Sequence, residues 1–416
     1  MTIVQKERKG IMKKLLALIL TGIMLFSLMG CGGTGKEEDS SNKSSDVNDT
    51  EQAEGTEEIV IGLSIPLTGA LAESGEQVIK AADLAVETIN NNGGVNGKTV
   101  RYEVLDDKMD PTEAALVAQR FLENSEITAV IGSLTSGTTL AVLPIYEEAG
   151  MPVICPTGNS PDLAGYGNFI RIVMDASLEA PMVGALAMNN LGAQKVGIIY
   201  DNSDYGASMV EYSTKIVNDR GGELVASEAF TAGTDKDFSV QLAKMQQVGA
   251  DTIILVADYN EGSLIISQAE TMGGFEEVKW IGDSYLLGNP MLERIGGSEL
   301  AANVYCACDY NPYSSSPNHV AFVEAFSEAY EGLIPSEPAG FTYDAFTIIC
   351  DALKEGAEKE TLVETIKTME FSDLICSESV KFDENGNRVG SGNDIVIIKD
   401  GEFAASGDTV DTTGIY

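Results

Sequence analysis

Short apolar segments alternate with amphipathic helical segments along most of this chain. The period of the apolar residues predicts strands at the following ranges: Ile59–Ile65, Thr99–Leu105, Ala129–Ile131, Val153–Cys155, Lys195–Tyr200, Glu223–Phe230, Thr252–Val256, Lys279–Ile281 and Asn303–Cys306. It predicts helices between and after them at Gly75–Asn91, Pro111–Asn124, Gly137–Glu148, Ser177–Leu191, Tyr205–Arg220, Phe238–Val248, Glu261–Met272, Asn318–Glu331, Ala339–Gly356 and Thr361–Met369. Because each helix returns the chain to the start of the next strand, the strands should run parallel, with helices on both faces.

The length of the chain indicates more than one such sheet. A single hydrophobic core rarely serves more than about 250–300 residues, and this chain has 416. We therefore expect an α/β fold with two doubly wound lobes. Near the C-terminus, Ser379–Phe382 and Asp394–Ile398 read as the two strands of a β-hairpin around a turn at residues 383–387. In open parallel sheets, ligands bind outside the carboxyl ends of the strands, so the loops that follow strands are the candidate site.

The N-terminus has the three parts of an export signal. Lys13 and Lys14 precede the apolar run Leu15–Met29, and small Gly30 precedes Cys31. Residues 28–31 resemble the bacterial lipobox, which implies cleavage after residue 30 and a lipid on Cys31. An ordinary secretory signal and a membrane anchor are the alternatives. Residues 31–57 are acidic and rich in Ser, and they predict a flexible tether. The chain should then be extracytoplasmic, with the Cys31 lipid in the membrane.

The strongly acidic net charge of the chain limits the kinds of ligand that it can bind. The whole chain carries a formal charge of −38, and loss of residues 1–30 removes five basic side chains and one acidic one, which gives −42. Nucleic-acid binding depends on clustered Lys and Arg, so this balance excludes it. A neutral or zwitterionic solute fits better than an anion.

The residues needed for catalysis are scarce. His319 is the only histidine, so neither a Ser/His/Asp set nor a multi-histidine metal site can form, and we place it at an exposed helix start. Five cysteines besides Cys31 leave at least one unpaired, and we expect most of them to be buried small hydrophobes without disulfides. We predict neither an enzyme nor a bound metal or cofactor.

Six segments resemble type I periplasmic solute-binding proteins, and most closely the branched-chain amino-acid (Leu/Ile/Val-binding-protein-like) subunits of ABC transporters. They are Ile61–Gly69, Ile89–Gly97, Asp106–Pro111, Ile131–Thr139, Pro156–Pro161 and Tyr200–Gly206. The resemblance runs from Ile59 to Ile398. It implies two lobes joined by three crossovers, which close around a ligand in the manner of a Venus flytrap. We expect residues 58–175 and 308–372 in lobe 1, and residues 176–307 and 373–416, including the hairpin and tail, in lobe 2.

The resemblance also implies a function. The chain would be a monomeric subunit that captures a branched-chain or similar small zwitterionic amino acid and delivers it to the membrane permease of an ABC importer. Two alternatives stay open: a free-standing solute sensor of the same fold, and a binder of a small amide or urea-like solute.

Two loops match the family positions that hold the carboxylate of the ligand. Ser136 and Gly137 begin a helix, whose free N–H groups suit an anion, although Ser136 would serve equally as an N-cap. Thr157, Gly158 and Asn159 match a second stretch that meets the backbone of the ligand. Here Asn159 stands where the family has a hydroxyl residue, and a plain turn is the alternative.

The ammonium requires a carboxylate, and the residues leave two candidates. Asp283 follows strand Lys279–Ile281, and Asp258 follows strand Thr252–Val256, where several relatives have tyrosine. For each, the alternative is a solvated loop charge. Tyr205 matches a family aromatic that closes over the ligand, and Ser74 a pocket position that is usually tyrosine, which would leave room for a larger ligand.

Overall fold

The computed structural model describes residues 58–372, 374–376, 379–390 and 394–413, all of which belong to one compact unit that begins at residue 55. The expected signal peptide (residues 1–30), Cys31 and the tether (residues 31–57) lie outside the described residues. Among the helices that are described, none is long and apolar enough to cross a membrane.

Strand β1 (Glu58–Ile65) shows why the apolar segments become strands. Its last seven residues are buried, because it lies between β2 and β3 inside a five-stranded parallel sheet. Alternate side chains point to opposite faces. Ile61 and Leu63 contact the cluster that includes α2 and α11, whereas Val60 contacts the cluster that includes α3 and α4.

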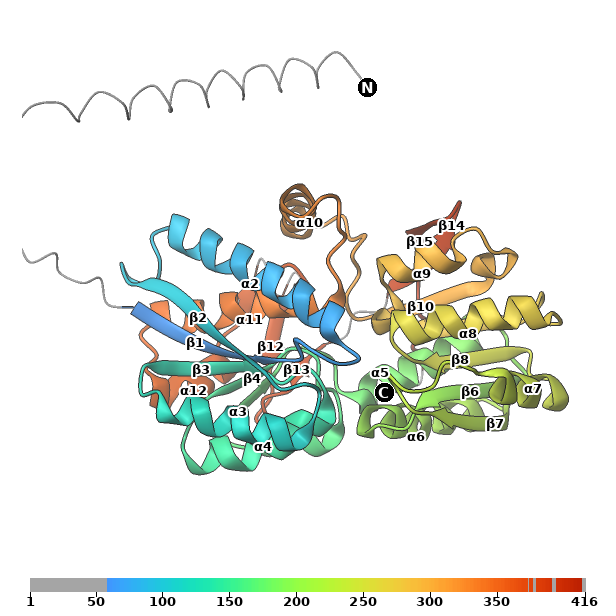
Figure 1. Ribbon diagram of the computed structural model, residues 1–416, viewed down its shortest axis with the longest axis horizontal. Helices are drawn as coiled ribbons and strands as arrows, with labels where there is room; N and C mark the ends of the chain where they lie inside the picture. Colours follow the sequence, from blue (N-terminus) through green and yellow to red (C-terminus); the bar gives the residue numbers. More distant parts are fainter. Residues whose placement is uncertain (1–57, 373, 377–378, 391–393, 414–416) are drawn as a thin grey trace, which may run out of the picture. The chain divides into compact units, whose positions relative to one another are not determined.

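The first lobe is built on this sheet, whose order is β2-β1-β3-β4-β5. Its strands are β1, β2 (Thr99–Asp106), β3 (Ile127–Gly132), β4 (Val153–Cys155) and β5 (Phe169–Arg171). Its helices are α2 (Ala72–Asn91), α3 (Pro111–Glu123), α4 (Ser136–Glu148), α10 (Pro317–Ala329), α11 (Glu337–Lys354) and α12 (Leu362–Thr368), with short turns η1 (Pro161–Leu163) and η5 (Lys359–Thr361). Figure 1 shows α2 along one face of the sheet and α3 and α4 along the other.

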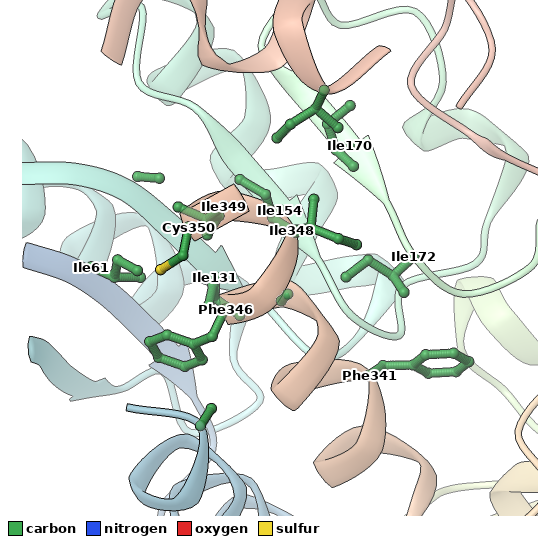
Figure 2. Close-up of a cluster of buried hydrophobic side chains, with 14 of the residues drawn as sticks. Ile61, Ile131, Ile154, Ile170, Ile172, Phe341, Phe346, Ile348, Ile349 and Cys350 are labelled. Atoms are coloured by element: carbon green, nitrogen blue, oxygen red, sulfur yellow. The ribbon is translucent and has the colours of Figure 1, made fainter. Parts of the chain in front are cut away.

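The core of this lobe forms where α11 meets the strands. Figure 2 shows Phe346 and Cys350 of α11 next to Ile61, Ile131 and Ile154 of the sheet. All five side chains are inaccessible to solvent. This packing fixes the position of α11 against the sheet, and with it the position of the first turn of α11 relative to the carboxyl ends of the strands.

The second lobe has a seven-stranded sheet of order β15-β14-β10-β9-β8-β6-β7. The parallel strands are β6 (Lys195–Asp201), β7 (Glu223–Phe230), β8 (Thr252–Val256), β9 (Lys279–Asp283) and β10 (Val304–Cys308). Strands β14 (Asp394–Lys399) and β15 (Glu402–Thr409) extend the sheet beyond β10 in antiparallel pairing. Its helices are α5 (Ala176–Ala185), continued by η2 (Leu186–Asn190), α6 (Asp204–Asp219), α7 (Ser239–Val248), α8 (Tyr259–Met272) and α9 (Asn289–Ile295), with η3 (Ser284–Leu286) and η4 (Glu299–Asn303). The predicted fold class, α/β with two doubly wound parallel-sheet lobes, is confirmed.

The expected C-terminal hairpin forms around the predicted turn at residues 383–387, but its second strand is not the predicted one. Strand β12 (Ser379–Phe382) pairs with β13 (Arg388–Val389) and β11 (Phe371–Ser372), whereas β14 pairs with β10 and β15. Val380 and Phe382 lie in the first-lobe core. Residues 379–389 thus belong with the first lobe, not the second lobe as expected, because the apolar side chains of β12 are buried in the first-lobe cluster.

Two further expectations differ from the structure. The short strand β5 and helix α9 were not predicted, because three and seven residues are too short for a periodic signal. His319 is buried, not exposed: its Nδ1 lies 3.0 Å from the carbonyl oxygen of Ile375, and its ring packs against Tyr310. Cys155, Cys306, Cys308, Cys350 and Cys376 are all free, and all but Cys376 are buried, as predicted.

Candidate functional site

A cavity of about 270 Å³ opens at the carboxyl ends of the strands. The loops after β1, β2, β3, β4, β6 and β9 line it, as do the starts of α2 and α11, so both lobes contribute. Its described walls are formed by Leu71, Ser74, Met109, Pro111, Leu134, Thr135, Ser136, Gly137, Thr138, Thr157, Asn159, Val173, Glu179, Asp201, Asn202, Ser203, Asp204, Tyr205, Asp283, Tyr285, Glu337 and Pro338. Seven of the nine predicted ligand residues are in this set; Gly158 and Asp258 are not.

The first turn of α4 supplies backbone donors to the cavity. Thr135 is the N-cap, and its hydroxyl accepts from the N–H of Thr138, so Ser136 is the first helical residue and not the cap. The Ser136 hydroxyl accepts from the N–H of Ser160 at 3.1 Å, which ties this turn to the loop after β4. Within the described residues we find no acceptor for the N–H groups of Ser136 and Gly137. These donors, at the positive end of the helix, suit a carboxylate.

The loop after β4 is fixed by side-chain hydrogen bonds. The Thr157 hydroxyl donates to the carbonyl oxygen of Leu134 at 2.6 Å. The Asn159 amide nitrogen donates to Glu179 at 2.5 Å, and the buried Asn159 Oδ1 has no hydrogen-bond partner among the described residues. Gly158 packs away from the cavity: a Cβ there would lie 2.9 Å from Cys155 Sγ. Its place is therefore dictated by packing against Cys155.

Asp283 ends β9 and faces the cavity. Its carboxylate accepts from the N–H of Tyr285 at 2.9 Å and from the hydroxyl of Tyr205, so both oxygens are engaged. The rings of Tyr205 and Tyr285 meet edge to face, with centroids 6.0 Å apart. Burial raises the pKa of Asp283 to about 6.

The other predicted carboxylate, Asp258, lies outside the cavity wall. It is the N-cap of α8 and accepts from the N–H groups of Asn260 and Glu261. Burial, followed by a hydrogen bond with the Glu261 side chain, raises its pKa well above the usual range. The Asp258 carboxylate thus caps the N-terminus of α8 and does not face the cavity.

Two buried acidic residues that were not predicted also line the cavity. Glu179, in α5, accepts from Asn159, and Glu337, the first residue of α11, accepts from the hydroxyl of Ser284. They are 2% and 6% exposed. Burial, followed by the charge of Asp283, raises the pKa of Glu337 to about 8 and that of Glu179 well above its usual range. Asp201, the last residue of β6, and Asp204, the first residue of α6, complete an acidic wall, and none of the described lining residues is Lys, Arg or His.

Comparison with known proteins identifies the fold family. The periplasmic binding protein family matches residues 58–402. The chain belongs to this family. The "Leucine-, isoleucine-, valine-, threonine-, and alanine-binding protein" of Pseudomonas aeruginosa is 26% identical over 79% of this chain and 87% of its own length. "Leu/Ile/Val-binding protein homolog 3" of Brucella melitensis is 29% identical over 73% of this chain and 79% of its own length.

A solved structure agrees with these relatives. The branched-chain amino acid transporter substrate binding protein of Streptococcus pneumoniae, solved in complex with isoleucine, superposes with a TM-score of 0.76 at 28% identity, over 84% of this chain and 99% of that one. This periplasmic binding protein thus falls among the substrate-binding proteins of branched-chain amino-acid ABC transporters, as the sequence predicted. It is an extracytoplasmic binding protein and not an enzyme.

Proposed function

We propose that this periplasmic binding protein captures a branched-chain or similar small amino acid and hands it to the permease of an ABC importer. The observation that carries the proposal is the composition of one cavity, whose wall contains both the free helix N–H groups at the start of α4 and buried carboxylates. These are the groups that the carboxylate and the ammonium of an amino acid require. Between them, Leu71, Met109, Pro111, Leu134, Val173 and Pro338 offer an apolar surface for the side chain.

We assign the roles within the site as follows. Ser136, Gly137 and Thr157 meet the ligand carboxylate, with Asn159 beside them. Asp283 meets the ammonium, Tyr205 covers the ligand from the second lobe, and small Ser74 sets the room for the side chain. Because the cavity has walls from both lobes, a ligand that contacts both favours the closed arrangement. The closed form is the one that docks on the permease.

A thermal-melt panel tests the ligand class. The panel contains the twenty amino acids, their amides and urea, each added to the purified chain. A ligand at about 100 times its Kd should stabilise the folded state by about 2.7 kcal/mol. We expect leucine, isoleucine or valine to give the largest shifts. Absence of a shift with every amino acid would refute the proposal, and shifts with the amides alone would favour a binder of neutral solutes.

We also propose that a lipid on Cys31 holds the protein at the outer face of the cell membrane. The support is the sequence: an apolar run after Lys13 and Lys14, a lipobox at residues 28–31 and an acidic, Ser-rich segment before β1.

A further inference from the structure

Three carboxylates from three separate elements face the same cavity. Glu179 comes from α5, Asp283 from the end of β9 and Glu337 from the first turn of α11. Each is at most 6% exposed. Asp283 and α5 belong to the second lobe, whereas α11 belongs to the first. The cluster therefore spans both lobes.

Two buried arginines, Arg388 and Arg171, each form an ion pair with another carboxylate. Arg388 forms an ion pair of 2.8 Å with buried Asp309, and Arg171 pairs with Asp175. Among the described residues of the cavity wall none is basic. An uncompensated buried charge is costly, so this wall requires either protons or a cationic group of the ligand.

The hydrogen bonds of the cluster leave oxygens available. Among the described residues, Glu179 accepts from Asn159 through Oε2, and Glu337 accepts from Ser284 through Oε2. The Oε1 atom of each is not used in these contacts. Asn159 Oδ1 is a further acceptor beside Glu179, buried and without a partner. Asp283, in contrast, already accepts one hydrogen bond on each oxygen.

We propose that Glu337 and Glu179, together with Asp283, form a three-carboxylate subsite for a primary ammonium group, which Glu337 contacts from the first lobe. The proposal rests on the proposed function and deepens it. A primary ammonium has three N–H donors and no acceptor, so each of the three carboxylates can accept one hydrogen bond from it. Because Glu337 and Asp283 stand on different lobes, one ammonium draws the two lobes together. The subsite should discriminate against ligands whose nitrogen carries a methyl group in place of a donor.

A dependence on pH follows from the same charges. The groups around Glu337 are Glu179 on α5, Asp283 at the end of β9, Ser284 next to it, and Asp309 with Arg388 at the crossovers. Asp201 and Asp204 face the cavity from the end of β6 and the start of α6. Burial raises the pKa of Glu337 to about 8 in the empty protein. A bound ammonium displaces that proton, so affinity should rise as the pH increases from about 6 to about 8.

Calorimetry with leucine and N-methylleucine tests the subsite in the wild-type chain, in Glu337→Gln and in Glu179→Gln. We expect each variant to bind leucine at least tenfold more weakly than the wild type, with a flatter pH profile for Glu337→Gln. Wild-type affinity for N-methylleucine should be at least tenfold below that for leucine, and the difference should shrink in both variants. Glu364→Gln, on the exposed side of α12, is the matched control and should bind as the wild type does.

The outcomes separate the two proposals. Leucine affinities within twofold of wild type in both variants would overturn the subsite and leave the proposed function standing. Equal wild-type affinities for leucine and N-methylleucine would do the same without any variant, so the test does not depend on how the variants fold. If the wild-type chain binds no amino acid at all, the proposed function fails and the subsite fails with it.

Discussion

Asp283 and Asp258 show how two similar loop carboxylates acquire different tasks. Asp283 ends β9 and Asp258 follows β8 in the second lobe, yet only Asp283 lines the cavity, while Asp258 caps α8. We expect Asp283→Asn to weaken leucine binding by about ten- to hundredfold, because a charge-assisted hydrogen bond contributes about 1.5–3 kcal/mol. Asp258→Asn should stay within about twofold and keep its stability, because asparagine is an equally good N-cap. Titration calorimetry decides, and a larger loss in Asp258→Asn would contradict the assignment.

The buried acids also predict how the stability of the empty protein depends on pH. Burial raises the pKa of Glu337 to about 8 and those of Asp283 and Asp344 to about 6. In the unfolded chain such carboxyls titrate near pH 4. Because the pKa values of these carboxyls are higher in the folded state than in the unfolded state, their protonated forms stabilise the fold. This contribution is fully present below about pH 4 and is lost as the pH rises through about 6 and then 8.

The melting temperature of the ligand-free chain should therefore fall between about pH 5 and pH 8.5. In Glu337→Gln the fall above pH 7 should be smaller, since the group with the highest of these pKa values is gone. Differential scanning calorimetry at matched ionic strength measures both profiles. Identical slopes above pH 7 would show that Glu337 does not titrate in this range.

Single residues mark the limit of what the sequence could predict about the site. Ser136, Thr157 and Asp283 were proposed as ligand residues because they follow predicted strands, where a parallel sheet must place its ligand, and because their loops resemble those of the family. Glu179 lies inside a helix and Glu337 at the start of one, some 158 residues later. Only the packing of α5 and α11 brings them to one cavity. A buried acidic residue in an otherwise apolar stretch of a helix, such as Glu179 in Ala176–Ala185, was the one available signal.

The crossovers between the lobes meet at one buried ion pair. Asp309, just after β10, accepts from the N–H of Met174 at 2.8 Å and pairs with Arg388 of β13 at 2.8 Å. The described segments that leave β5, β10 and β13 are thereby joined through one carboxylate. The contacts of Asp309 with Met174 and Arg388 therefore fix the relative positions of these three segments where they leave their strands.

We expect Arg388→Met to lower the free energy of unfolding by about 3–5 kcal/mol, because it leaves the Asp309 charge buried without its partner. Arg101→Met is the control. Arg101 contacts three glutamates but is 36% exposed, and its loss should cost less than about 1 kcal/mol. Urea unfolding followed by circular dichroism gives both values. Equal losses of unfolding free energy in the two variants would show that the buried Arg388–Asp309 ion pair contributes no more to stability than the exposed contacts of Arg101.

The elements that were predicted well are those whose local pattern and tertiary place agree. Strands β6, β7 and β8 were placed within one residue, because each is a continuous apolar or alternating run between clear turns. The two C-terminal strands were also located within one residue, but their pairing was predicted wrongly. Ser379–Phe382 and Asp394–Ile398 look like partners in sequence, yet they join different sheets, and their apolar side chains are buried in the clusters of different lobes.

At the scale of the whole molecule, charge and anchoring belong together. The chain carries a formal charge of −38, and an anionic membrane surface attracts basic segments rather than acidic ones. Electrostatics alone would keep such a protein away from an anionic membrane surface. The proposed lipid on Cys31 would supply the missing attraction, because apolar burial of acyl chains does not depend on the charge of the protein.

The lipid therefore predicts membrane association that salt does not disturb. The wild-type protein should stay in the membrane fraction through a high-salt wash and enter the detergent-rich phase of a phase-separating detergent. Cys31→Ser should abolish the detergent partition, because serine offers no thiol for acylation. Cys376→Ser, which changes a cysteine of the folded part, should partition as the wild type does. Release of the wild-type protein by salt alone would mean that a protein contact, not a lipid, holds it at the membrane.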